Sequence, residues 1–234
     1  MTSIPPHRPL TIAHRSANDL GRLRAATALG VDFHECDVWL YQDRVEIRHE
    51  KTLGRLPIRW DRWKLEWRGP PRLVLARLLE DWEGPGTLLL DLKGRAEALP
   101  GKVLDTFAAA GQDIPFAVTA RTWSLLEPFL WIPGVATFPS VGSTRNMRDL
   151  LAMDQRPWSG VSVHRKLLSA EGVQRLRTVG PVVTTWPVNS MEAFDEVMGY
   201  GVDGISSDSL DVLAEVRKRR PRHAAEGPGS CEIA

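Results

Sequence analysis

The chain of 234 residues lacks the features of secreted and membrane-spanning proteins. It has only two cysteines, Cys36 and Cys231, which are too few for a disulfide framework. It has no apolar run near the roughly 18 residues that a membrane helix needs. Its first ten residues also lack the apolar core of a secretory signal. We therefore expect a cytoplasmic protein with no transmembrane segment.

An excess of charge of one sign is missing as well. The chain carries 30 basic and 29 acidic residues, a formal net charge of +1, and this balance argues against a nucleic-acid partner. The exception is the segment 217–222, which has five basic residues. We expect a solvated helix end there, and peripheral contact with an anionic membrane surface is the alternative. The sequence leaves the oligomeric state open.

Short apolar runs alternate along the chain with longer segments of helical periodicity. The runs predict eight strands, at 10–13, 31–40, 87–92, 115–120, 135–141, 160–164, 182–186 and 203–207. A helix is predicted after each strand, at 17–29, 73–82, 95–110, 122–131, 144–153, 169–179, 190–199 and 209–219. Eight such units in this length predict an α/β protein with a single-domain (β/α)₈ TIM barrel. An open doubly wound sheet is the alternative, but its usual Gly-rich first turn is absent at 14–17.

The predicted barrel occupies residues 10–219, after an N-terminal extension at 1–9 and before a flexible basic and polar tail at 220–234. A short extended piece at 45–49 is followed by an insertion at 50–71, which holds three prolines and two glycines and is predicted to be irregular. Three tryptophans gather in the insertion, at positions 60, 63 and 67. We expect a small packed lid there, and the alternative is a substrate lip facing a lipid or choline-like headgroup.

Acidic side chains occur in pairs on two neighbouring predicted strands. Glu35 and Asp37 lie two residues apart and so share one face of a strand, and Asp91 and Lys93 do the same on the next barrel strand. Three carboxylates form a suitable oxygen cage for one divalent cation, Mg²⁺ or Ca²⁺. Lys93 could instead form a structural ion pair with Asp91. Spacing alone leaves both interpretations open.

Histidines end two extended segments that flank these carboxylates. His14 follows the first strand and His49 follows the piece at 45–49. Their near-neutral pKa range would allow one to act as a base and the other as an acid. A cation with Arg15 or Lys93 could hold a phosphate. The pattern indicates metal-assisted cleavage of a phosphate ester, with His164 at the end of a later strand as a further residue of the same mouth.

These residues, in this order, resemble the glycerophosphodiester phosphodiesterase family over about residues 10–216. The segment 10–15 is similar to the family's first strand, which ends in His-Arg-Gly. The segment 30–53 resembles its Glu-x-Asp strand, hairpin and second histidine, and 88–93 resembles the metal strand that follows. The segment 186–189, with 201–208 after it, is similar to the closing strands. The chain departs from the family at Ser16, which replaces Gly, at Asp91, which replaces the more usual Glu, and in lacking Glu-Asn-Thr after the first strand.

The resemblance implies a barrel that hydrolyses glycerophosphodiesters, small-molecule substrates, to sn-glycerol 3-phosphate and an alcohol. It implies His14 and His49 as the acid/base pair and one divalent ion on the three carboxylates. It also implies that Arg15 and Lys93 contact the phosphate and that Trp186 lines the pocket. Two alternatives remain. One is lysophospholipase D-like cleavage of lysophospholipids, and the other is a non-catalytic descendant that binds a phosphorylated ligand.

Overall fold

The computed structural model describes residues 9–52, 58–61, 64–67 and 73–219. The tail predicted at 220–234 and nearly all of the extension predicted at 1–9 lie outside these ranges, so their prediction stands as made.

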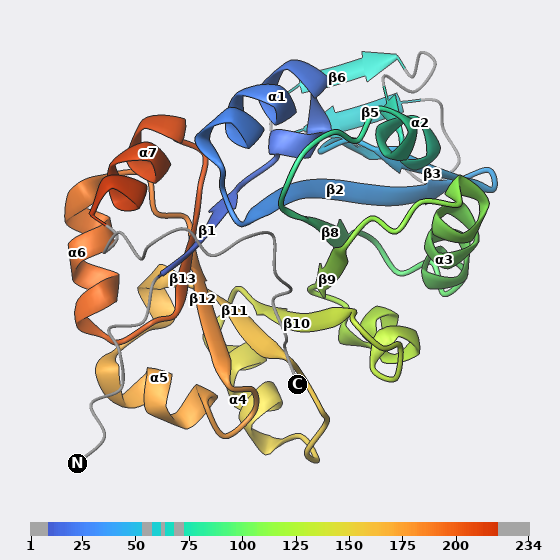
Figure 1. Cartoon of the computed structure of the whole chain (residues 1–234). Coiled ribbons are helices and arrows are strands. Elements are labelled where there is room, and N and C mark those ends of the chain that lie inside the picture. The colour runs from blue at the N-terminus through green and yellow to red at the C-terminus, as the bar shows by residue number, and fades with distance from the viewer. Residues whose placement is uncertain (1–8, 53–57, 62–63, 68–72, 220–234) are drawn as a thin grey trace.

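Eight parallel strands close into a barrel, as predicted (Figure 1). Each strand pairs in parallel with the next, and the first pairs with both the second and the last, which closes the ring. Leu-, Val- and Ala-rich strands of this kind are buried on both faces, as a barrel covered by helices requires. The strands are β1 (Leu10–Ala13), β2 (Phe33–Tyr41), β8 (Thr87–Leu92), β9 (Phe116–Ala120), β10 (Ala136–Val141), β11 (Gly160–His164), β12 (Val182–Trp186) and β13 (Gly204–Ser207).

Helices surround the barrel, and the last four α-helices begin at serines. Each of these serine side chains accepts a hydrogen bond from the amide three residues ahead, which satisfies one of the unpaired N–H groups of a helix start. The helices are α1 (Leu20–Leu29), α2 (Leu75–Glu80), α3 (Leu99–Ala110), α4 (Thr144–Ala152), α5 (Ala170–Leu176), α6 (Met191–Gly199) and α7 (Leu210–Lys218). Between β9 and β10 the connection is the 3₁₀ helix η2 (Trp123–Phe129), where Pro128 lacks the N–H that an α-helix would use.

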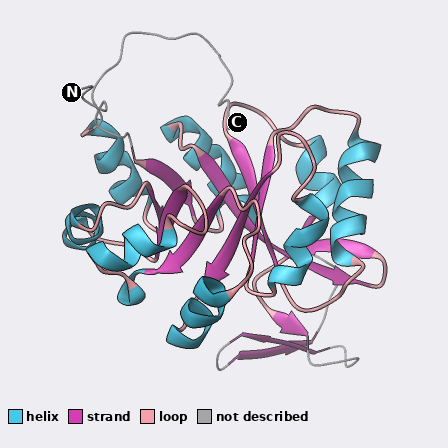
Figure 2. Cartoon of the chain, turned by 90° about the horizontal axis from the view of Figure 1, so that it is seen from below, coloured by secondary structure: helices cyan, strands magenta, loops and turns pink. Residues whose placement is uncertain are grey.

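The insertion after β2 contains strands, so the prediction of an irregular segment at 50–71 was wrong. β3 (Arg44–Ile47) pairs antiparallel with β2, and β7 (Leu73–Val74) pairs antiparallel with β3. β4 (Lys51–Thr52), β5 (Ile58–Asp61) and β6 (Lys64–Trp67) form a separate antiparallel sheet at the edge of the molecule (Figures 1 and 2).

This small sheet is not a packed lid, contrary to expectation. Trp67 is 80% exposed and Trp60 is 40% exposed, and Lys51 lies over the Trp60 ring, 5.6 Å from its centroid. Trp63 lies outside the described residues. The sheet therefore presents apolar side chains to the surroundings.

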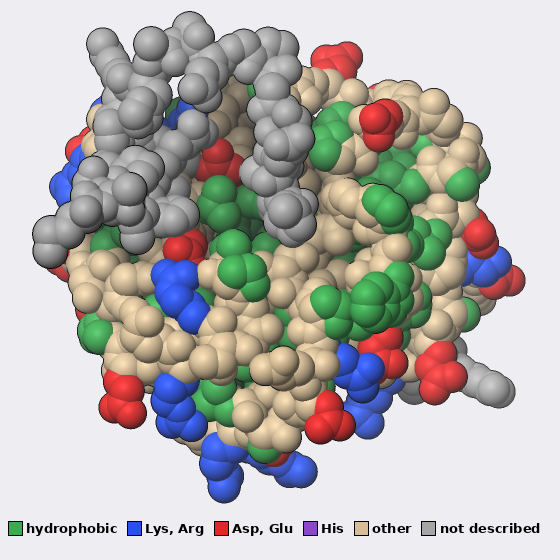
Figure 3. All heavy atoms as spheres, turned by 60° about the horizontal axis from the view of Figure 1, so that its bottom comes forward, with side chains coloured by type: hydrophobic (Ala, Val, Ile, Leu, Met, Phe, Trp, Pro, Cys, Tyr) green, Lys and Arg blue, Asp and Glu red, His purple; other side chains and the backbone are tan. Residues whose placement is uncertain are grey.

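Charged side chains are distributed over the surface in both signs. Figure 3 shows acidic and basic groups interspersed around the periphery of one face, with apolar groups nearer its middle. At the end of α7, Arg219 pairs with Asp195 at 3.0 Å and with Glu215 at 3.7 Å, as a solvated helix end would. None of the helices in the described part of the chain has the length and hydropathy to cross a membrane.

The start of β11 depends on a glycine. A Cβ atom at Gly160 would lie 2.3 Å from the carbonyl oxygen of Val182 and 2.6 Å from Cε1 of Phe138. We expect Gly160→Ala to lower the free energy of unfolding by about 1–3 kcal/mol or more, because neither the backbone nor the ring can yield without displacing a strand. Urea unfolding followed by circular dichroism measures this loss.

Gly101 in α3 provides the matched control, since a Cβ atom there meets nothing within 4 Å. Gly101→Ala should leave stability unchanged or raise it by up to about 1 kcal/mol through helix propensity. Equal stability of the two variants would contradict the close approach at Gly160.

Candidate active site

Strand alternation places the polar strand-end residues on the barrel axis. A small cavity inside the barrel is lined by Ile12, Phe33 and Leu89, among others. Side chains two residues apart on a strand point to the same side. The residues two positions further along these three strands therefore also face the axis, one layer nearer the carboxyl ends, where (β/α)₈ enzymes hold their active sites. They are His14, Glu35 and Asp91.

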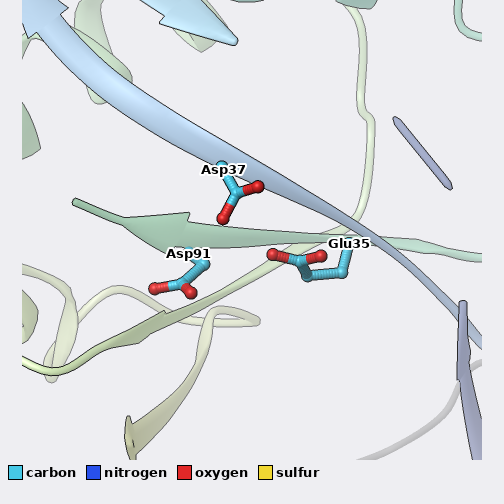
Figure 4. A group of neighbouring side chains, drawn as sticks. All are labelled: Glu35, Asp37 and Asp91. Carbon is cyan, nitrogen blue, oxygen red and sulfur yellow. The ribbon is translucent and has the colours of Figure 1, made fainter. Parts of the chain in front are cut away.

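The three predicted carboxylates converge in that layer. Glu35, Asp37 and Asp91 each offer one ligand oxygen, and these oxygens lie within 4.8 Å of one another. Figure 4 shows the three carboxyl groups gathered together beside the strands that carry them. Asp37 and Asp91 are also paired in register across these strands. Glu35 Oε1 and Asp91 Oδ1 are buried and accept no hydrogen bond from any described residue. Buried oxygens without donors fit a divalent cation, which prefers oxygen ligands.

Two cations reach the same cluster. Lys93 Nζ lies 2.8 Å from Asp37 Oδ1 and also contacts Asp91, while Arg15 Nε lies 3.3 Å from Asp37 Oδ2. Burial raises the pKa of Asp37, but Lys93, Asn18 and Arg15 outweigh it, so that the pKa is lowered overall. Burial also lowers the pKa of Lys93, and the surrounding carboxylates reverse this and raise it. Lys93 therefore forms the ion pair that the sequence left open. The same three carboxylates could also hold a metal ion.

Glu35 has the most perturbed environment of the three acids. Its burial first, and then the neighbouring Asp37, raise its pKa from 4.5 to about 7. The amide of Arg15 donates to Glu35 Oε2 at 2.6 Å, and His14 Nε2 lies 3.8 Å from the same oxygen. Arg15 adopts φ 54°, an uncommon conformation for a residue other than glycine, and it thereby presents both its amide and its side chain to the cluster.

His14 is oriented by residues that the sequence reasoning did not assign. Asp208 Oδ1 lies 2.7 Å from His14 Nδ1, and Asn189 holds Asp208 through two hydrogen bonds of 3.1 and 2.9 Å. Burial lowers the pKa of His14, but Glu35 and Asp208 outweigh this and raise it. The hydrogen bond from His14 lowers the pKa of Asp208. Asp208 follows β13 directly, so its position at a strand end was the available signal.

Asn18 is the second missed residue. It lies in the 3₁₀ helix η1 (Ser16–Asn18). Its amide group donates to Asp37 Oδ2 and accepts from the Asp37 backbone N–H, both at 2.9 Å. The short loop after His14 thus contributes a polar group to the cluster even though the family's Glu-Asn-Thr is absent. A single asparagine before a helix carries no sequence signal for this role.

The remaining predicted residues lie around this cluster. His49 follows β3 by two residues and is half-buried, beside Arg48, whose amide donates to the Asp37 carbonyl at 3.0 Å. Trp186 ends β12, with its ring centroid 4.9 Å from that of His164. His164 and Trp186 are opposite each other in the β11–β12 register. The catalytic and binding roles of these residues remain predictions.

We predict that Mg²⁺ or Ca²⁺ stabilises the fold through the carboxylate cluster. An ion that binds only the folded chain adds about 2.7 kcal/mol at a hundredfold excess over Kd. Differential scanning fluorimetry should show a rise in Tm with the ion that chelator reverses. Glu35→Gln should remove most of that rise, whereas Asp105→Asn on the exposed face of α3 should keep it. An equal rise in both variants would place the ion elsewhere.

The ion-free protein should lose stability as pH rises from about 4.5 to about 7. In this pH range native Glu35, with its pKa near 7, still binds a proton. In the unfolded chain the same carboxyl group has already released its proton near pH 4.5. The native state therefore holds more protons, and stability falls with increasing pH. Glu35→Gln should flatten this slope in chelator-treated protein when urea unfolding is compared between pH 5 and 8. Identical slopes in the two proteins would show that Glu35 ionises normally.

Comparison with known proteins places the fold among phosphodiesterase barrels. No protein-family model matches the sequence, and no curated protein matches it. The fold is similar to a glycerophosphodiester phosphodiesterase from Parabacteroides distasonis (TM-score 0.69, 17% identity, 91% of this chain and 98% of the other). It is also similar to one from Thermotoga maritima (0.65, 18%, 91% and 100%).

A third similar structure is an Oleispira antarctica phosphodiesterase in complex with the product sn-glycerol-3-phosphate (TM-score 0.64, 20% identity, 90% of this chain and 96% of the other). At these identities the likeness concerns the fold. Each match spans nearly the whole of both chains. The chain therefore has the (β/α)₈ barrel that is found in solved glycerophosphodiester phosphodiesterases.

Proposed function

We propose that this chain is a metal-dependent phosphoric diester hydrolase that converts glycerophosphodiesters to sn-glycerol 3-phosphate and an alcohol. The observation that carries the proposal is the convergence of three carboxylates within 4.8 Å of one another, beside an oriented histidine. The similar barrels, one of them described with bound sn-glycerol-3-phosphate, support the same reaction class.

Glu35, Asp37 and Asp91 would hold one divalent ion, Mg²⁺ or Ca²⁺. When bound, such an ion polarises a phosphoryl oxygen and neutralises charge that develops during displacement. Lys93 and Arg15 already lie within 3.3 Å of Asp37, so they add positive charge where a phosphate diester would enter. Arginine and lysine both donate charge-assisted hydrogen bonds to phosphate oxygens.

His14 serves as one member of the acid/base pair. Glu35 and Asp208 raise its pKa, and its contact with Asp208 leaves Nε2 facing the carboxylate layer. In the reaction a water or substrate hydroxyl attacks phosphorus, the P–O bond to the alcohol breaks, and that oxygen takes up a proton. We propose His49 as the other member of the pair for two reasons. The segment 30–53 resembles the part of the family that carries the second histidine, and His49 follows β3, which pairs with β2.

Cleavage of lysophospholipids is the second candidate, and the small sheet favours it. Leu65 and Trp67 are 64% and 80% exposed, and this sheet begins at Lys51, two residues after His49. An apolar surface so close in the chain to a catalytic residue suits a substrate with an acyl chain. A non-catalytic role is less well supported, because the chain keeps both histidines, all three acids and Lys93.

We expect phosphorus-31 NMR to show a phosphomonoester product from a mixture of glycerophosphodiesters and lysophosphatidylcholine. Product should form with Mg²⁺ or Ca²⁺ and stop with chelator, and the diester consumed identifies the substrate class. His14→Gln and Glu35→Gln should each lose at least about 100-fold in rate, in line with loss of acid–base or metal assistance.

The exposed variant Asp105→Asn should keep full rate, and circular dichroism should show that all three variants are folded. A cyclic phosphate signal would indicate transfer to a substrate hydroxyl. Full activity of either site variant would contradict the proposed mechanism. Ligand binding without turnover in any metal would favour the non-catalytic role.

A further inference from the structure

Arg121 occupies the same layer of the barrel as the proposed catalytic groups. It directly follows β9, and Thr119, two residues earlier, lines the axial cavity. Strand alternation therefore directs Arg121 toward the axis. Because Leu92 pairs with Ala120 in register, Arg121 lies beside Lys93, one strand further from the carboxylates.

Arg121 is exposed, and its charge is among the influences that lower the pKa of Asp91. Among the residues that the structure describes, Arg121 forms no ion pair, although Lys93 and Arg15 are both paired with Asp37. Its guanidinium carbon lies 5.2 Å from the centroid of the Trp186 ring. Burial first, then Lys166, Arg165 and Arg121, lower the pKa of the neighbouring His164.

Arg121 and Trp186 meet at a backbone position that has no side chain. Gly142 directly follows β10, the strand that pairs with β9. A Cβ atom at that position would lie 3.6 Å from the Arg121 guanidinium and 3.6 Å from the Trp186 ring. A free guanidinium on an aromatic face, next to an open backbone position, is a site that recognises an oxyanion.

We propose that Arg121 is a specificity-determining residue that binds a second anionic group, a carboxylate or a phosphate monoester, on the diester's alcohol. This inference rests on the proposed function, which places the scissile phosphate at the carboxylate cluster. A bare tryptophan face attracts quaternary ammonium groups. Here a guanidinium already lies over that face, so the site selects against a choline-type alcohol.

The test uses diesters of sn-glycerol 3-phosphate with matched second alcohols. These are 1,3-propanediol, its phosphate monoester, 3-hydroxypropanoate and choline. The wild-type protein with its metal should show a kcat/KM at least about 10-fold higher for an anionic diester than for the neutral one. The two anionic substrates distinguish a carboxylate site from a phosphate site.

Arg121→Met should lower kcat/KM for the preferred anionic diester about 10- to 100-fold, the range for loss of a charge-assisted hydrogen bond, and mainly through KM. The neutral diester should change less than about threefold, and the choline diester should improve. Arg121→Lys should restore part of the anionic preference. Arg175→Met, at an exposed position in the last turn of α5, should behave as wild type.

An equal loss on all four substrates would indicate a structural role and overturn the inference, as would a wild-type protein without charge preference. If no diester is hydrolysed, the proposed function fails separately. Calorimetric titration with the neutral and anionic diesters then decides the inference alone. The inference is supported if an anionic diester binds more tightly than the neutral one and Arg121→Met abolishes this difference. Equal binding of the anionic and neutral diesters overturns the inference.

Discussion

The structure depends on the confinement of three carboxylates at one end of the barrel. Asp37 is fully buried and Glu35 nearly so, and both share a space within 4.8 Å with Asp91. Burying like charges together is costly unless cations or hydrogen-bond donors compensate. The surroundings supply such groups from several strand ends: Lys93, the side chain and amide of Arg15, the amide of Asn18, and His14. Burial and Asp37 still raise the pKa of Glu35 to about 7, so the compensation of this carboxylate is incomplete.

That incomplete compensation also explains the local geometry of the first loop. Arg15 must offer its amide to Glu35 and its guanidinium to Asp37 at once, and a left-handed backbone at φ 54° permits both. Two residues on, the chain is already in η1 and places Asn18 against Asp37. A strained conformation persists where its surroundings determine it, and such residues gather at functional sites. Within the five residues from His14 to Asn18, the loop thus brings the Arg15 amide to Glu35 and the side chains of Arg15 and Asn18 to Asp37.

Much of this could be predicted from the sequence, since the barrel and the acid cluster follow from periodicities within single segments. Glu35 with Asp37, and Asp91 with Lys93, share faces by the period of a strand, and the order of parallel strands brings them together. The contacts that could not be predicted join distant segments. Asp208 meets His14 across 194 residues, and that contact depends on closure of β1 against β13 rather than on any local pattern. The strands β5 and β6 were missed because they depend on cross-strand pairs such as Trp60 with Leu65, whereas the three prolines and two glycines of the segment 50–71 favour an irregular chain.

The same reasoning explains why the two sides of the mouth differ. On the β2 and β8 side, Lys93 and Arg15 are paired with Asp37. A ligand there meets carboxylates whose charge is balanced only in part. On the β9 to β12 side, Arg121 stands over Trp186, beside Gly142, which has no side chain. Arg121 is exposed and forms no ion pair with the described residues, although its charge acts on Asp91, so it can meet a ligand that enters the mouth. A substrate with two negative groups, one for the metal cluster and one for Arg121, matches the charge on both sides of this mouth.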